Sequence, residues 1–98
     1  MSYHWSRDEA LEVLDVLRGF GGSATTIQIF EEIWRRSQRR LVNNSISSLR
    51  SWAEQERGIP RDRVVECEYL GQNERGKQVY RYTLCAELME PRRQAVLF

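Results

Sequence analysis

The sequence predicts an α+β domain in which three helices are followed by a β-hairpin and a short C-terminal helix or tail. Up to Arg57, apolar residues recur three and four positions apart, which is the spacing of helices with one buried face. Beyond Pro60, apolar and polar residues alternate with the period of two that is typical of strands. The 98 residues are enough for one domain with one modest core.

The first helix is predicted over residues 7–18. Ser6 precedes Glu9 by three positions, which is the spacing of a capping box. Asp8 and Glu9 also suit the positive end of the helix dipole. The expected apolar stripe consists of Ala10, Leu11, Leu14 and Leu17.

The second helix is predicted over residues 26–37, after a short extended link at Ser23 and Ala24. Thr25 and Gln28 have the spacing of a second capping box. We expect one buried face on this helix, made of Ile27, Phe30, Ile33 and Trp34.

The third helix is predicted over residues 43–57, with Asn43 as its N-cap and Gly58 as its stop. Its apolar residues, Trp52 among them, are expected to face the core. Serine is a mediocre helix former, so a serine-rich face on this helix needs a reason. Small hydroxyls allow close approach and bond phosphates or base edges, which makes this face a candidate binding surface. The face consists of Asn44, Ser45, Ser47, Ser48, Arg50 and Ser51.

The hairpin is predicted to have strands over about residues 63–70 and 77–84, joined by a polar loop over 71–76. Cys67 falls on the first strand and Cys85 at the end of the second, and both are expected to be reduced, buried apolar residues. Residues 86–90 favour a short helix before Pro91. The consecutive apolar residues 95–98 are expected to pack either on their own domain or on a second subunit.

Charge is distributed unevenly along the chain. Residues 1–34 carry two basic and six acidic groups, residues 35–50 carry five arginines and no acid, and residues 51–98 carry eight of each. The net charge of +1 therefore conceals a basic segment between the second and third helices. Arginine suits phosphate and guanine because its guanidinium is planar and carries several donors.

Several functional classes lack their usual sequence features. His4 is the single histidine, and neither a metal-ligand cluster nor a nucleophile or phosphate-loop motif is found, so we expect no enzyme, metal or cofactor. No apolar run reaches the length of a membrane span, and no small-molecule substrate is evident. The first residues do not resemble a signal peptide, which favours the cytoplasm.

The order of elements resembles that of the winged helix-turn-helix superfamily over about residues 6–84. Residues 42–49 look like the start of a recognition helix, and residues 64–69 and 79–84 are similar to wing strands. The resemblance implies a winged helix domain over residues 1–84, followed by a helix or tail over 85–98. It also implies that the third helix enters the major groove and that the 71–76 wing contacts the DNA backbone.

The resemblance and the charge pattern together predict a double-stranded DNA-binding protein, acting as a homodimeric transcriptional regulator. Two alternatives stay open, a protein-interaction module and a non-specific DNA-binding subunit of a larger complex. The candidate DNA-binding residues are Arg35, Arg36, Arg39, Arg40, Asn43, Asn44, Ser45, Ser47, Ser48, Arg50, Ser51, Arg75 and Lys77.

Overall fold

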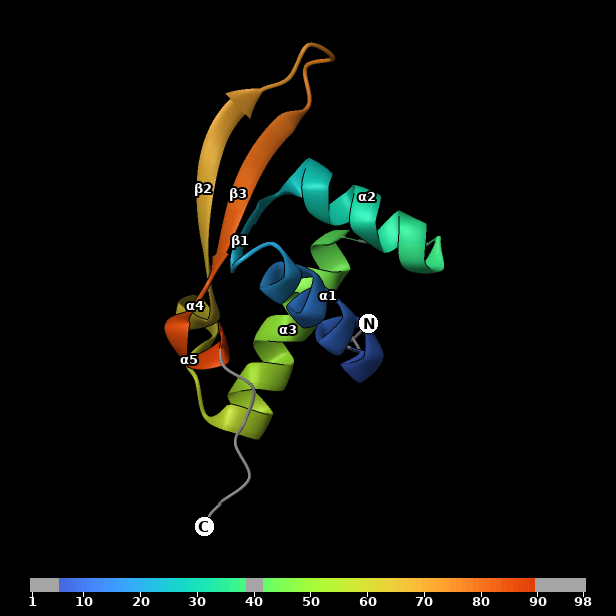
Figure 1. Cartoon of the computed structure of the whole chain (residues 1–98). Coiled ribbons are helices and arrows are strands. Elements are labelled where there is room, and N and C mark those ends of the chain that lie inside the picture. Colours follow the sequence, from blue (N-terminus) through green and yellow to red (C-terminus); the bar gives the residue numbers. More distant parts are fainter. Residues whose placement is uncertain (1–5, 39–41, 90–98) are drawn as a thin grey trace, which may run out of the picture.

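The computed structural model describes residues 6–38 and 42–89, with side chains in the third helix described from Ser45 onward. Within these residues the chain folds as an α+β domain with five helices and a three-stranded antiparallel sheet (Figure 1), which confirms the predicted class. The elements are α1 (Arg7–Gly19), β1 (Ser23–Thr25), α2 (Thr26–Ser37), α3 (Val42–Arg57), α4 (Arg61–Val64), β2 (Val65–Gln72), β3 (Gln78–Leu84) and α5 (Ala86–Met89).

The first two helices begin where their caps predict. At α1, the Ser6 hydroxyl accepts a hydrogen bond from the amide of Glu9 at 3.3 Å. At α2 the capping box is reciprocal. Gln28 N donates to Thr25 Oγ1 at 3.2 Å, and Thr25 N donates to Gln28 Oε1 at 2.9 Å. These bonds satisfy amides that the first turn of a helix leaves without partners.

The ends of α3 agree with the prediction to within a residue. The helix begins at Val42, so Asn43 lies inside it and not at the cap position. Gly58 follows its last residue with φ of 67°, the left-handed conformation that glycine adopts without a steric penalty. The single turn α4 occupies the predicted beginning of the first hairpin strand, and β2 therefore begins at Val65.

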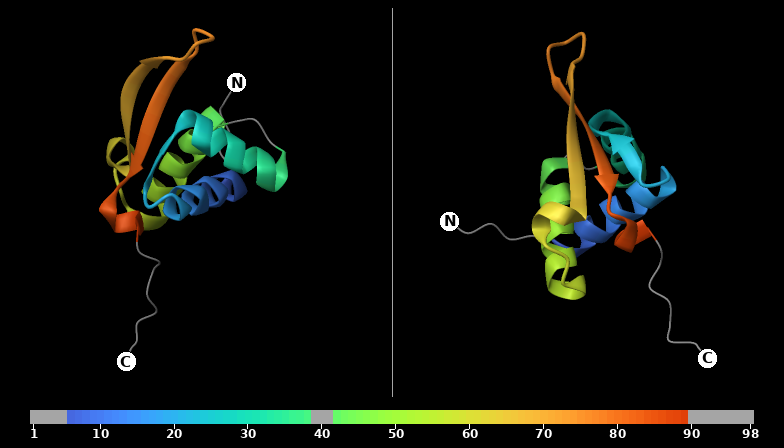
Figure 2. Two further views of the ribbon diagram at one scale, coloured as in Figure 1. Left: turned by 45° about the horizontal axis from the view of Figure 1, so that its top comes forward. Right: turned by 90° about the vertical axis from the view of Figure 1, so that its left-hand side faces the viewer.

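The sheet has the strand order β1-β3-β2. Residues 23–25, expected only as an extended link, form a strand that pairs with β3, and Ala24 lies opposite Tyr82. On the other side of β3, Cys67 of β2 lies opposite Tyr82 of β3. A register shift between Tyr69 and Gly71 interrupts the hairpin ladder. The outer half of the hairpin extends beyond the helices (Figures 1 and 2).

The core lies between α1, α3 and the half of the sheet nearest to α5. Leu17, Leu49 and Leu88 are fully buried there, and Trp52 is 4% exposed, as predicted. Residues 86–89 form the short C-terminal helix α5 that the sequence predicts. It covers one end of the core with Leu88, while the apolar residues 95–98 lie outside the described residues.

The predicted buried face of α2 is wrong in three of its four residues. Ile33 is buried, but Ile27, Phe30 and Trp34 are 43%, 36% and 39% exposed. The helix turns Ile29 and Ile33 toward the core instead. Both sets have helical spacing, so periodicity alone does not decide which of two apolar stripes is buried.

The prediction for Cys67 is also wrong, because its side chain is exposed, whereas Cys85 is partly buried. Cys67 lies on β2, where every residue from Glu66 to Leu70 is exposed because the hairpin has left the helical body. Among the helices of residues 6–38 and 42–89, none combines the length and apolarity that crossing a bilayer demands.

Candidate nucleic-acid interface

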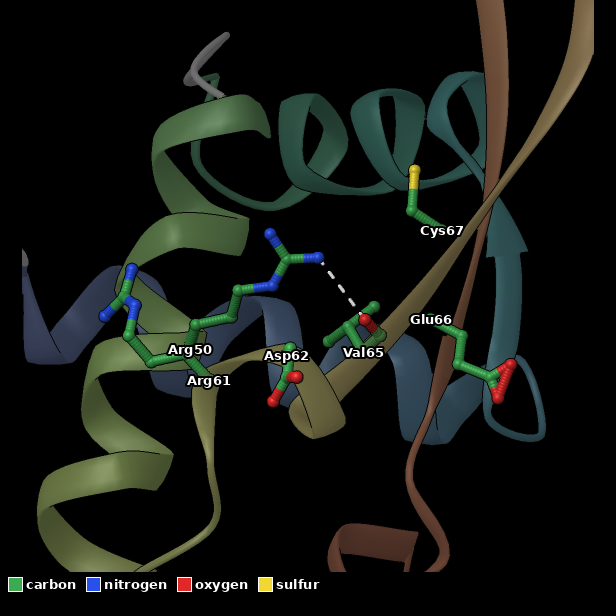
Figure 3. A pocket seen from close by; sticks show the side chains of 6 residues that line it. All are labelled: Arg50, Arg61, Asp62, Val65, Glu66 and Cys67. Atoms are coloured by element: carbon green, nitrogen blue, oxygen red, sulfur yellow. Dashed lines mark hydrogen bonds between the residues drawn. The ribbon is translucent and has the colours of Figure 1, made fainter.

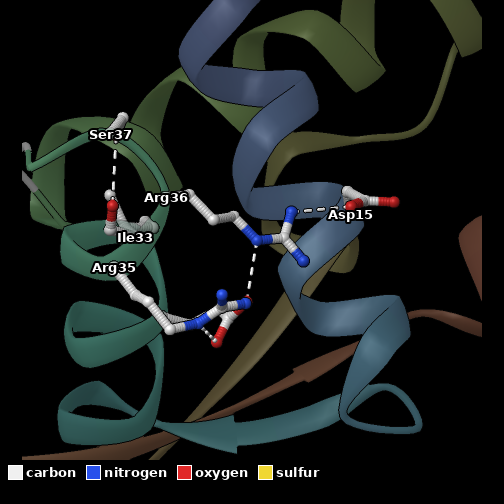
Figure 4. Close-up of polar contacts among 6 residues, drawn as sticks. Asp15, Ile33, Arg35, Arg36 and Ser37 are labelled. Carbon is white, nitrogen blue, oxygen red and sulfur yellow. Dashed lines mark hydrogen bonds and ion pairs between the residues drawn. The ribbon is translucent and has the colours of Figure 1, made fainter.

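Two of the candidate arginines, Arg35 and Arg36, lie in the last turn of α2 and are engaged in ion pairs (Figure 4). Arg35 pairs with Glu32. Arg36 pairs with Glu32 at 2.8 Å and with Asp15 of α1 at 2.7 Å. The hydrogen bonds from Arg35 and Arg36 lower the pKa of Glu32 to about 2, and Glu32 in turn raises the pKa of both guanidinium groups.

The view of residues 35–50 as a segment of unaccompanied cations is therefore corrected for Arg35 and Arg36. Their acids come from outside that window of the sequence, one three residues upstream and the other from α1. The network joins the end of α2 to α1 and leaves less charge for an external phosphate. Arg39 and Arg40 lie outside the described residues.

The serine-rich face of α3 is the second correction. Ser45, Ser48 and Ser51 are 3%, 0% and 6% exposed, so they do not line a surface that DNA could reach. Ser48 Oγ accepts a hydrogen bond at 3.0 Å from the amide of Ser6, which precedes α1. The hydroxyl of Ser51 accepts one at 2.5 Å from Arg61 Nη1.

These serines are buried because α3 packs on α1 and also contacts α4 and α2, which covers most sides of its middle turns (Figure 1). Small side chains allow α1 to approach closely, and their hydroxyls find partners inside the protein. Ser47 is partly exposed and is the one serine of this face that remains a candidate contact. For Asn43 and Asn44 the structure describes the helical backbone and not the side chains.

Arg50 lies partly buried between α3 and the hairpin (Figure 3). Its Nη2 donates to the carbonyl oxygen of Val65 at 3.3 Å, and its Nε is buried with no hydrogen-bond partner. The guanidinium is thus directed at the β2 backbone and not, as expected, outward to phosphate or guanine.

A hollow of about 530 Å³ lies beside Arg50. Two cationic and two acidic side chains line it, so it has no net charge and no clear preference for an anion. Its lining residues are Arg50, Arg61, Asp62, Val65, Glu66 and Cys67 (Figure 3).

The hairpin tip presents the two remaining candidate cations. Asn73 Oδ1 accepts hydrogen bonds from the amides of Arg75 at 2.9 Å and Lys77 at 3.0 Å, which fixes the turn. The side chains of Arg75 and Lys77 are exposed, and neither makes an ion pair within the described residues. Glu74 lies exposed between Asn73 and Arg75, so the loop carries a net charge of +1.

A row of tyrosines along the hairpin was missed at the level of sequence. The ring centroids of Tyr69 and Tyr80 are 5.4 Å apart, and those of Tyr80 and Tyr82 are 6.5 Å apart. Exposure rises from Tyr82 at 7% to Tyr69 at 53%, toward the tip. Burial, followed by the nearby thiol of Cys67, raises the pKa of Tyr82. The alternation of the two strands contained this signal, because cross-strand pairing places such residues on one face.

The structure thus keeps only part of the predicted set accessible, at the hairpin tip and at one position of α3. Arg75, Lys77 and Ser47 remain accessible. The other candidates whose side chains the structure describes are paired or buried, namely Arg35, Arg36, Ser45, Ser48, Arg50 and Ser51. Within the described residues, no three histidine, cysteine or acidic side chains are grouped so as to hold a metal ion. No protein-family model, characterised protein or solved structure matches the chain.

Proposed function

We propose that this chain binds double-stranded DNA, with the tip of the β2–β3 hairpin on the phosphate backbone and α3 alongside it. The observation that carries the proposal is the projecting hairpin, whose exposed cations Arg75 and Lys77 have no ion-pair partner among the described residues. Cationic side chains on a protruding loop gain little by packing on their own domain, and they suit a polyanion.

The order of elements supports the same proposal. Helix, short strand, two helices and hairpin follow one another as expected for a winged helix-turn-helix domain, and the sheet order β1-β3-β2 places the hairpin beside the helices. In that layout α3 is the recognition helix and the loop between β2 and β3 is the wing.

The burial of three serines changes how such a complex would discriminate sequences. Only Ser47 and the first turn of α3, with Asn43 and Asn44, remain as candidates to reach base edges. Contacts to the backbone would then dominate the affinity. This favours the non-specific DNA-binding subunit relative to the sequence-specific regulator that we expected, and a selection of bound duplexes from a random pool distinguishes them.

The test is the salt dependence of duplex binding, measured by fluorescence anisotropy. Replacing both Arg75 and Lys77 by alanine removes two phosphate contacts, so the log–log salt slope should fall by about two units. The matched control is Arg63→Ala. Arg63 is an exposed arginine of α4 that pairs with Glu87 at 2.6 Å, at the end of the domain away from the wing.

The control should leave the slope unchanged. Absence of salt-dependent binding by the intact chain, or an equal slope in the double variant, would reject the proposed contact. A chain that binds no duplex would instead favour the protein-interaction module, a reading supported by the exposed apolar side of α2.

A further inference from the structure

The outer side of α2 carries an apolar groove that shares only Lys77 with the proposed DNA contact. Ile27, Phe30 and Trp34 are each more than one-third exposed and share one helix face, with the Phe30 and Trp34 rings stacked at 6.5 Å. Together with Lys77 they line a hollow of about 510 Å³. Neighbouring exposed apolar side chains that form a concave surface indicate a binding site more strongly than scattered ones.

The chain leaves its last described helix close to the path that leads to this groove. At the end of α5, Met89 packs on Gly22, and its Sδ lies 2.6 Å from the position that a Cβ on Gly22 would occupy. Gly22 directly precedes β1, and α2 follows β1 without a break. Ile27 is five residues from Gly22, a span of at most about 18 Å.

The segment after Met89 is long enough for its last residues to reach the groove, because the nine residues from Met89 to Phe98 span about 30 Å in extended conformation. Ala95 is six residues beyond Met89, a reach of about 20 Å in extended conformation. From Ala95 to Phe98 an extended chain covers about 10 Å more. The groove has nearly the same length, because Ile27 and Trp34 are seven residues apart on a helix that rises about 1.5 Å per residue.

We propose that the apolar segment Ala95–Phe98 docks into the groove of Ile27, Phe30 and Trp34 of the same chain. Four consecutive apolar residues match the apolar lining, and their burial there removes both surfaces from water. The chain itself favours its own segment over one from a second copy, because a connection of only five residues gives a high effective concentration. This inference is independent of the proposed DNA binding.

The first experiment places a charge in the segment of the full-length chain. Leu97→Asp should release the segment, which shifts the indole NMR signal of Trp34 and lowers the Tm by about 5 °C. The matched control is Gln94→Asp, which adds the same charge outside the apolar residues and should change neither quantity.

The second experiment removes the groove. In a Phe30→Ser background Leu97→Asp should have no further effect on the Tm, because interacting residues are not additive. In a Phe20→Ser background it should keep its full effect, since Phe20 is equally exposed, at 40%, but lies outside the groove. A Leu97→Asp variant with an unchanged Trp34 signal would overturn the proposal. So would effects that grow with protein concentration together with a doubled mass, which would assign the groove to a second copy.

Discussion

The hydroxyl of Ser48 distinguishes a helix face buried against α1 from one directed at a ligand. Its side chain is 0% exposed, and its Oγ accepts the amide of Ser6 at 3.0 Å. Replacing Ser48 by alanine removes this acceptor and changes the volume of the site very little. Ser47, its partly exposed neighbour, provides the matched control.

The expected change in the free energy of unfolding of Ser48→Ala follows from two opposing contributions. Leaving the Ser6 amide without its acceptor costs about 1–2 kcal/mol, toward the lower part of the range because Ser6 is only partly buried. Alanine is the better helix former and returns about 0.5 kcal/mol. Ser48→Ala should therefore lower the free energy of unfolding by about 1 kcal/mol, whereas Ser47→Ala should leave it unchanged or raise it by about 0.5 kcal/mol.

Urea denaturation followed by circular dichroism measures both variants under one set of conditions. In a domain of this size, 1 kcal/mol corresponds to a change in Tm of about 4–8 °C, which thermal melting detects independently. If Ser48→Ala were as stable as the parent chain or more stable, this face of α3 would not be packed on α1. The serine face would then return as a candidate DNA-binding surface.

Four further predictions concern charged and polar side chains. The pKa of Glu32 falls from 4.5 to about 2 on folding, so its ion pairs stabilise the folded chain fully above pH 4.5 and this stabilisation is lost as the pH falls toward 2. Glu32→Gln should therefore flatten this part of a plot of Tm against pH. Parallel plots for the variant and the parent chain would exclude the effect. Replacing Arg39 and Arg40 by alanine should weaken binding to all duplexes and lower the salt slope by about one to two units, and an equal slope would remove them from the interface. Asn44→Ala should change the preference for particular base pairs by about 1–3 kcal/mol, and a uniform loss of affinity over all DNA sequences would make Asn44 a backbone contact instead. Arg50→Ala should mainly reduce the stability of the fold, because Arg50 donates to the carbonyl oxygen of Val65.

Local signals in the sequence were sufficient for most of the fold. The Ser6 and Thr25 caps mark the beginnings of α1 and α2, and Gly58 marks the end of α3. These features are predictable because each depends on residues three or four positions apart. The single turn α4 and the pairing of β1 with β3 depend on contacts that are distant in sequence, and they were not predicted in detail.

The candidate site was harder to predict, for a physical reason. Whether Ser48 or Trp34 faces solvent depends on how many elements surround its helix, and periodicity does not contain this information. Because α3 is covered on most sides, its polar face is buried, whereas α2 lies at the edge and keeps an apolar face exposed. The pairing of Arg36 with Asp15 likewise depends on tertiary structure. The hairpin cations Arg75 and Lys77 were predictable because a tight polar turn exposes its side chains.

The most direct test of the DNA-binding proposal is a map of the surface that a duplex perturbs. Titration of the isotopically labelled chain with a short DNA duplex should shift the NMR signals of Arg75, Lys77 and Ser47 and leave those of Arg63 and Glu87, at the other end of the domain, unchanged. These shifts should decrease as salt is added. Absence of a shift at Arg75, or shifts confined to Ile27, Phe30, Trp34 and Lys77, which line the groove of α2, would contradict the proposed interface.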